Sequence, residues 1–273
     1  MRDIPVLEEL DEGVLRLTLN RPHRKNAFDD AQWNGLRTAL ERARGDDSVA
    51  VVVVTGAGGD FSAGQDLRAF RSATADEGAG EVASAGGAEA IALHPFGRFM
   101  NALCAFDKPL LAAAPGVAVG IGATLLFHCD LVYVGESLRL RLPFVSLGLV
   151  PEAASSYLLQ VAIGSQRAAE LFYTAEWVDA RRAVELGIAA RAFPDRVLLE
   201  ATLEKAREIA RWPVRSLQAT KRCLRAVHAE GIRIARAAED AGMAAQAGSP
   251  ENVEAIRAFL EKREPDFRNL RPG

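Results

Sequence analysis

The chain has 273 residues, of which 49% are hydrophobic and 25% are charged, and its formal net charge is −3. This length allows a substantial core without disulfides or structural metals. The charge balance gives no support to a nucleic-acid-binding protein, and no acidic tail points to a basic partner.

The cysteines and histidines form no metal-binding pattern. The three cysteines include no Cys-x-x-Cys pair, and no two of the four histidines lie four residues apart. We therefore expect no metal and a reducing compartment. Residues 1–12 are acidic and lack the apolar run of a signal peptide, so the expected location is cytoplasmic.

Residues 109–129 contain no charged side chain and are long enough to span a bilayer. However, Pro115, Gly116, Gly120 and Gly122 interrupt the middle of this segment. They divide it into a short strand, a turn and a short helix, and charged sequence resumes on both sides. We predict that the segment is protein core and that the chain has no membrane association.

In chain order, the first elements alternate between strand and helix. Alternating residue types at 14–19 predict a strand, which Arg21-Pro22 ends. Asp29 suits the N-cap of a helix whose apolar stripe covers residues 33–43. The β-branched run at residues 49–55 is typical of a strand buried on both faces.

The rest of the chain continues this mixture and then becomes helical. Helices are predicted at residues 91–106, 165–173, 179–186, 197–210, 214–229, 232–245 and 251–262, and strands at 110–114, 131–134 and 138–142. We therefore predict an α/β protein with a core domain at residues 1–194 and a C-terminal helical region at residues 195–273.

Two glycine-rich turns, at residues 59–66 and 116–123, follow predicted strands. In the simplest interpretation, glycine only supplies unusual backbone angles there. A dinucleotide site would need a third glycine, where the two turns have Phe61 and Leu125. In a third interpretation, free N–H groups of both turns form an oxyanion hole for a thioester enolate. Spacing alone leaves the first and third interpretations open.

Short motifs occur in a fixed order through residues 14–194. They are Asn20-Arg21-Pro22, Asn26-Ala27, Val54-Thr55-Gly56, Phe61-Ser62-Ala63-Gly64-Gln65-Asp66, Lys108-Pro109, Pro115-Gly116-Val117-Ala118-Val119-Gly120, Cys129-Asp130, Leu147-Gly148-Leu149 and residues 183–188. This set resembles the enoyl-CoA hydratase/isomerase (crotonase) family. The resemblance implies a crotonase-like spiral of ββα units with a C-terminal helical trimerisation region. It also implies an acyl-CoA thioester substrate, no separate cofactor, and a homotrimer or dimer of trimers.

The resemblance also assigns site residues. The backbone N–H groups of Gln65 and Ile121 would form the oxyanion hole. The expected substrate-binding residues are Arg24, Lys25, Ala63, Gly64, Asp66, Leu67, Gly120 and Phe144. Residues 72–90 match the family's variable wall of the acyl pocket, and Lys221 is a further candidate for a phosphate contact.

Hydratases of this family use two glutamates, one to activate water and one to supply a proton. In this chain those positions are Thr124 and Phe144, and neither side chain is an acid or base at neutral pH. Residues 143–157 instead resemble the monofunctional Δ3,Δ2-enoyl-CoA isomerase branch, in which a single glutamate moves a proton from C2 to C4. The resemblance therefore implies Glu152 as the catalytic base.

Several alternatives stay open. Pro151-Glu152 also suits the first turn of a helix, where a glutamate complements the helix dipole. Another crotonase reaction, such as hydration with an unorthodox base, would use the same fold. A non-catalytic acyl-CoA-binding protein would keep the site without turnover, and a nucleotide-dependent oxidoreductase is more distant. Structural roles are expected for Asp130 and His128.

Overall fold

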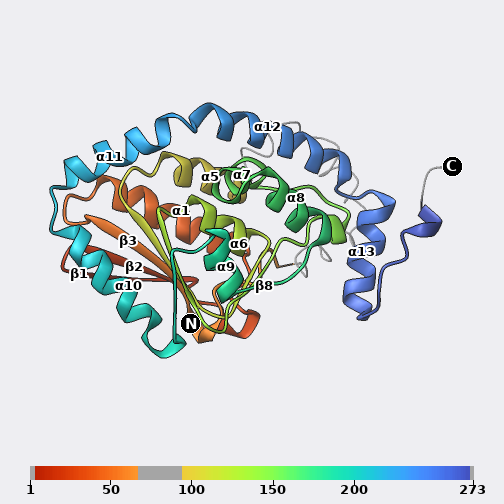
Figure 1. Ribbon diagram of the computed structural model, residues 1–273, viewed down its shortest axis with the longest axis horizontal. Helices are drawn as coiled ribbons and strands as arrows, with labels where there is room; N and C mark the ends of the chain where they lie inside the picture. The colour runs from red at the N-terminus through yellow and green to blue at the C-terminus, as the bar shows by residue number, and fades with distance from the viewer. Residues whose placement is uncertain (1–3, 67–93, 271–273) are drawn as a thin grey trace.

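The computed structural model describes residues 4–66 and 94–270. It contains a large six-stranded sheet and a smaller three-stranded sheet (Figure 1). In spatial order the large sheet consists of β1 (Val6–Asp11), β2 (Val14–Leu19), β3 (Val51–Gly56), β4 (Leu110–Ala114), β6 (Leu131–Gly135) and β9 (Arg191–Phe193). The smaller sheet consists of β5 (Val117–Val119), β7 (Arg139–Arg141) and β8 (Val178–Asp179). Only the β1–β2 pair of the large sheet is antiparallel, so its other strands end at a common edge.

Helices surround the large sheet and form the C-terminal part. They are α1 (Asp30–Gly45), α5 (Pro95–Ala105), α6 (Ile121–Thr124), α7 (Ser155–Ile163), α8 (Ser165–Thr174), α9 (Ala180–Leu186), α10 (Asp195–Ala210), α11 (Val214–Ala226), α12 (Ala229–Gln246) and α13 (Pro250–Glu261). Short 3₁₀ helices are η1 (Pro22–Arg24), η2 (Ala57–Gly59), η3 (Leu125–His128), η4 (Val145–Leu147) and η5 (Arg268–Leu270). In Figure 1, α11 and α12 run along the top of the molecule. The predicted α/β class is confirmed.

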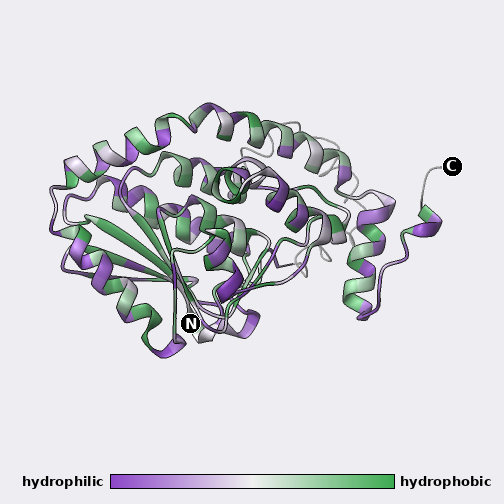
Figure 2. Ribbon diagram, viewed as in Figure 1, coloured by the Kyte–Doolittle hydropathy of each residue, from purple (hydrophilic) through white to green (hydrophobic). Residues whose placement is uncertain are grey.

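Strand β3 is buried on both faces, as its β-branched sequence predicts. Val52 and Val54 belong to the main core, which also contains the buried faces of α1 and α5. Val51 and Val53 point the other way and pack in a second cluster with Ala206 of α10. The strands are correspondingly apolar along their length (Figure 2). Thus α10, the first helix of the predicted C-terminal region, covers the outer face of the sheet, and the boundary at residue 194 stays a prediction.

An aromatic cluster joins α1 to α5. Phe28 and Trp33 stack with ring centroids 4.1 Å apart, and Phe99 of α5 lies 5.2 Å from the Trp33 ring. All three side chains are almost completely buried. Asp29, between the first two, caps α1 by accepting a hydrogen bond from the N–H of Gln32. The N-cap predicted at Asp29 is therefore confirmed.

The uncharged segment 109–129 is protein core. It forms β4, β5, α6 and η3, and nearly all of its apolar side chains are buried. Within residues 4–66 and 94–270, no helix is both long and apolar enough to cross a bilayer. The predicted strand and short helix of this segment are confirmed, whereas the predicted turn between them also contains the short strand β5.

Helix α11 is attached to the core by a buried ammonium group. Lys221 is 4% exposed, and its Nζ donates to Asp130 Oδ2 at 2.7 Å and to Lys108 O at 2.8 Å. Asp130 also accepts a hydrogen bond from the N–H of Leu110 at the start of β4. Burial lowers the pKa of Lys221. Asp130 is structural as expected, whereas Lys221 serves the fold and is not presented to a phosphate.

The differences from the sequence prediction lie at sheet edges and at one helix start. Strand β1 was not predicted, because only Val6 of its residues is buried and no apolar alternation results. The three-residue strand β9 at the other edge was also missed. The interpretation of Glu152 as a first-turn residue is wrong, because α7 begins only at Ser155.

The buried contact of Lys221 can be tested by Lys221→Met. This change removes the donor from the Asp130 carboxylate and should lower the free energy of unfolding by about 2–3 kcal/mol. Lys205→Met, at a partly exposed position on α10, is the control and should change stability by less than about 0.5 kcal/mol. Equal effects of the two changes in urea denaturation would contradict a structural role for Lys221.

Candidate active site

The first glycine-rich turn directs the N–H of Gln65 away from α1. The N–H of Phe28 donates to Gly64 O at 2.7 Å, and the N–H of Asp66 donates to Phe28 O at 3.0 Å. In a trans peptide the C=O and N–H groups point in opposite directions. Because Gly64 O points toward Phe28, the N–H of Gln65 points away from it. The Gln65 side chain is held by Trp33, whose Nε1–H donates to Gln65 Oε1 at 3.2 Å.

The second turn leaves the N–H of Ile121 at the open start of α6. Gly120 has φ +54°, and its carbonyl accepts hydrogen bonds from Ala123 and Thr124, each at 2.9 Å. The N–H of Ile121 therefore points in the opposite direction, out of the helix. No hydrogen bond joins it, or the N–H of Gln65, to a backbone carbonyl elsewhere in the described ranges. Toward the part of the chain that the structure describes, both amides therefore keep a free donor.

The two turns pack backbone against backbone. The N–H of Ser62 donates to Val117 O, and the N–H of Val119 donates to Ser62 O, both at 2.9 Å. A Cβ added to Gly64 would lie 2.6 Å from Val119 O and 3.7 Å from the Cα of Gly120. Only glycine permits this approach. Since Gly64 precedes Gln65 and Gly120 precedes Ile121, the peptides that carry both free amides adjoin the contact.

Glu152 lies between η4 and α7, on a backbone turn. The residue keeps part of its surface accessible, while its carboxyl group is surrounded by protein. Burial raises the pKa of Glu152 to about 7, and the negative charge of Glu239 raises it further. A carboxyl group with this pKa can both accept and return a proton at neutral pH.

The turn that carries Glu152 is strained. Ala153 and Ala154 have φ +60° and +57°, in the left-handed region that costs an alanine about 1–2 kcal/mol. The carbonyl of Ala153 lies 2.7 Å from Nε2 of His128 at the end of η3, which continues α6. Burial lowers the pKa of His128 to about 4, so the ring is neutral and donates through Nε2. The helical segment α6–η3 begins at Ile121 and ends at His128, which contacts the turn of Glu152.

The two positions that the resemblance assigns to the hydratase glutamates carry no ionisable group. Thr124 is fully buried, and its hydroxyl has no hydrogen-bond partner among residues 4–66 and 94–270. Phe144 is buried against Phe172, with ring centroids 6.3 Å apart. Both side chains extend the core and supply no acid or base.

The predicted coenzyme A contacts lie along one edge of the first turn. Arg24 and Lys25 are exposed at the end of η1. The carbonyl of Lys25 accepts a hydrogen bond from the N–H of Ala63. The Nζ of Lys25 lies 3.2 Å from Asp60 Oδ2. Asp66 pairs with Arg21 at 3.1 Å. Leu67 and residues 72–90 lie outside the described residues.

Comparison with known proteins identifies the family. Residues 9–270 match the family model for enoyl-CoA hydratase/isomerase. The chain belongs to the enoyl-CoA hydratase/isomerase family. It shares the crotonase fold with an enoyl-CoA hydratase/isomerase of Pseudoalteromonas atlantica, at 36% identity and a TM-score of 0.86, over 96% of this chain and 99% of that one.

Relatives in the family differ in the reaction that their names give. A 2,3-dehydroadipyl-CoA hydratase of Escherichia coli is 34% identical over 94% of this chain and 96% of its own length. An enoyl-CoA delta isomerase 2 of Rattus norvegicus is 33% identical over 94% of this chain and 64% of its own length. The family therefore establishes an enzyme of this class, and the individual reaction must be argued from the site.

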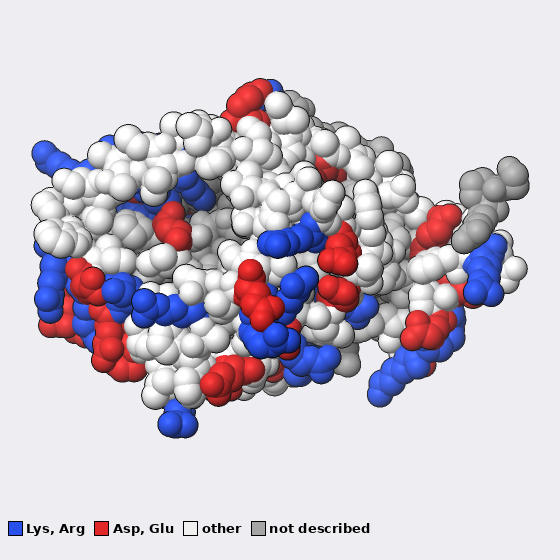
Figure 3. Space-filling model, viewed as in Figure 1, with Lys and Arg blue, Asp and Glu red and all other residues white. Residues whose placement is uncertain are grey.

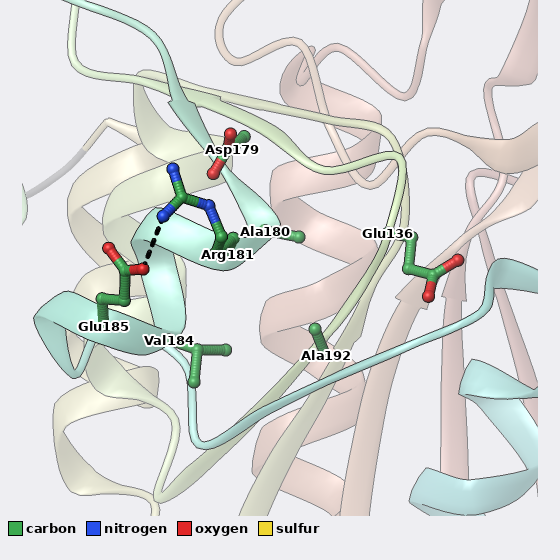
Figure 4. Close-up of a pocket in the computed structure, with 7 residues that line it drawn as sticks. All are labelled: Glu136, Asp179, Ala180, Arg181, Val184, Glu185 and Ala192. Atoms are coloured by element: carbon green, nitrogen blue, oxygen red, sulfur yellow. Dashed lines mark hydrogen bonds and ion pairs between the residues drawn. The ribbon is translucent and has the colours of Figure 1, made fainter.

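Two surface cavities in the described residues lie apart from these side chains. One, of about 470 Å³, is lined by α9 and its neighbours and includes Glu136 and the Arg181–Glu185 ion pair (Figure 4). None of the predicted site residues lines it. Charges of both signs are mixed on the face shown in Figure 3. The glycine turns, rather than either of these cavities, are therefore the candidate active site.

The glycine contact predicts different effects of two similar substitutions. Gly64→Ala places a methyl group against Val119 O and should displace the N–H of Gln65, lowering kcat/KM for an enoyl-CoA about 100-fold. Gly59→Ala is a matched control, because Gly59 also has positive φ but a Cβ there meets nothing within 4 Å. It should lower stability by about 1–2 kcal/mol and preserve turnover. Full activity of Gly64→Ala would contradict this role of the turn.

Proposed function

We propose that this protein is a Δ3,Δ2-enoyl-CoA isomerase with Glu152 as its single acid–base residue. The observation that carries the proposal is one carboxyl group, surrounded by protein on the turn that follows η4, whose pKa burial raises to about 7. The side chains at the two hydratase positions, Thr124 and Phe144, cannot transfer protons. A reaction that needs one proton carrier fits this site better than one that needs two.

In the proposed reaction, the Glu152 carboxylate removes a proton from C2 of a 3-enoyl thioester. The C–H electron pair moves toward the carbonyl and gives a dienolate, whose negative charge lies on the thioester oxygen. The protonated Glu152 then returns the proton to C4. The carbonyl re-forms and the double bond lies between C2 and C3, so that no atom is gained or lost.

The N–H groups of Gln65 and Ile121 would stabilise the dienolate oxygen. Preorganised amides of this kind contribute most where charge develops in a site that excludes water. The buried Phe144 and its neighbours would help to exclude water, which favours proton return to carbon over hydration. We propose Arg24, Lys25, Ala63, Gly64, Asp66, Leu67 and Gly120 as the coenzyme A and thioester contacts, with no separate cofactor.

The proposal includes a homotrimer or a dimer of trimers. Helices α11 to α13 expose several large apolar side chains, which an isolated monomer would leave in water. They include Leu224, Val227, Ile234, Val253 and Phe259. A cytoplasmic location is also proposed, since Cys104, Cys129 and Cys223 are all free thiols.

Hydration is the second candidate, because the Escherichia coli relative is named a hydratase. A hydratase would need water held beside the substrate and a further proton carrier. Rates with a 3-enoyl-CoA and with a 2-enoyl-CoA separate the candidates. The proposal requires conversion of the first substrate and no appreciable hydration of the second.

The role of Glu152 is tested by Glu152→Gln. The amide cannot accept a proton, so kcat for 3-enoyl-CoA should fall by about 10²–10⁴-fold while thioester binding persists. In the unchanged enzyme, kcat/KM should rise with pH along a limb near pH 7, because only the ionised carboxylate accepts the proton. Glu170→Gln, on the exposed face of α8, is the matched control. Undiminished turnover of Glu152→Gln would eliminate Glu152 as the base.

Glu152→Gln should also stabilise the protein above neutral pH. The pKa of Glu152 is about 7 when folded and about 4.5 when unfolded, so folding favours the protonated form. The stability of the unchanged protein should therefore fall as pH rises from about 4.5 to 7. At pH 8, Glu152→Gln should raise the free energy of unfolding by up to about 3 kcal/mol, with no difference at pH 4. Denaturant unfolding at both pH values checks this, and a destabilised variant at pH 8 would contradict it.

A further inference from the structure

Glu239 of α12 contacts the backbone of the turn that carries Glu152. Its side chain is 95% removed from solvent, since the residue is 5% exposed. Glu239 Oε2 accepts a hydrogen bond from the N–H of Ala154 at 2.6 Å, and Oε1 accepts one from the N–H of Ser156 at 2.8 Å. Both oxygens of this carboxylate are thus used to hold one short stretch of main chain.

A local backbone hydrogen bond, from the N–H of Ser155 to Glu152 O at 3.0 Å, closes this turn, but the N–H groups of Ala154 and Ser156 are bound from outside it. Ala154 is the N-cap of α7, and an alanine side chain cannot accept a hydrogen bond from the helix N–H groups. Ala153 and Ala154 are both left-handed, which alanine adopts only when its surroundings enforce it. Glu239, 85 positions beyond Ala154, supplies the missing acceptor.

A second buried contact, made by His128, holds the carbonyl side of the same turn. His128 of η3 donates through Nε2 to the carbonyl of Ala153 at 2.7 Å. The carbonyl of His128 in turn accepts a hydrogen bond from Arg225 of α11 at 3.2 Å. The backbone next to Glu152 is therefore fixed between the core and the C-terminal helices.

We infer that Glu239 is a positioning residue for Glu152, which fixes the left-handed turn through the N–H groups of Ala154 and Ser156. The inference rests on the proposed function, in which Glu152 is the base. It makes the C-terminal helix α12 part of the active-site machinery. Glu239 itself needs no contact with the substrate.

The charge of Glu239 gives this role a measurable signature. Its carboxylate disfavours ionisation of Glu152, so neutralising it should lower the pKa of Glu152. Burial raises the pKa of Glu239 as well, and Asp240 adds to that effect. Other titratable or charged groups on the packed elements include Arg236 and Asp240 on α12, Lys221 and Arg225 on α11, His128 on η3, and the Tyr157–His228 pair.

Glu239→Gln is the test, with pH–rate profiles on 3-enoyl-CoA. The amide retains one acceptor oxygen and presents an NH₂ group to the other backbone N–H. We expect kcat to fall about 10-fold or more, KM to change little, and the acid limb to move to lower pH. Glu230→Gln, the same change in the exposed first turn of α12, should leave all three values unchanged.

Glu239→Asp separates position from charge and serves as the test if the glutamine variant does not fold. It keeps the charge but shortens the side chain, so kcat should fall while the acid limb stays in place. If Glu152→Gln is inactive but both Glu239 variants keep the kcat and acid limb of the unchanged enzyme, the inference is overturned and the proposed function stands. If Glu152→Gln is fully active, the proposed function fails and the inference fails with it.

Discussion

The packing of two glycine turns against each other is the constraint on which the site depends. Gly64 approaches Val119, and a Cβ on Gly122 would lie 2.3 Å from Ser62 O, so side chains are excluded from both sides of the contact. Two strand-like hydrogen bonds at 2.9 Å fix the relative position of the turns. The amide of Gln65 follows Gly64 directly, and that of Ile121 lies between Gly120 and Gly122, so both amides adjoin this contact.

The proposed acid–base group, Glu152, is held at the expense of stability. Water would lower the pKa of Glu152, and its partial removal raises that pKa to about 7. The left-handed alanines beside it add backbone strain. The fold offsets both costs through contacts that reach the turn from η3 and α12. The C-terminal helices therefore support the turn of Glu152 as well as the core.

Local patterns in the sequence predicted the parts of the structure that depend on local chemistry. The buried β3 strand, the Asp29 cap and the two glycine turns are each encoded by adjacent residues. The contacts of Glu239 with Ala154 and Ser156 could not be predicted, since they join residues more than 80 positions apart and no motif marks Glu239. The start of α7 was misplaced because Pro151-Glu152 favours a helix locally, whereas tertiary contacts enforce left-handed Ala153 and Ala154. Leu67, which was predicted to contact the substrate, lies outside the described residues.

The most direct test of the oxyanion hole is the vibrational frequency of a bound thioester carbonyl. An isotope-labelled 3-enoyl-CoA bound to Glu152→Gln would allow its C=O stretch to be measured by infrared difference spectroscopy. Two hydrogen bonds from Gln65 and Ile121 should polarise the carbonyl and move the stretch to lower frequency than in free thioester in water. A stretch at the same frequency as in water, with binding intact, would show that these amides do not converge on the carbonyl oxygen.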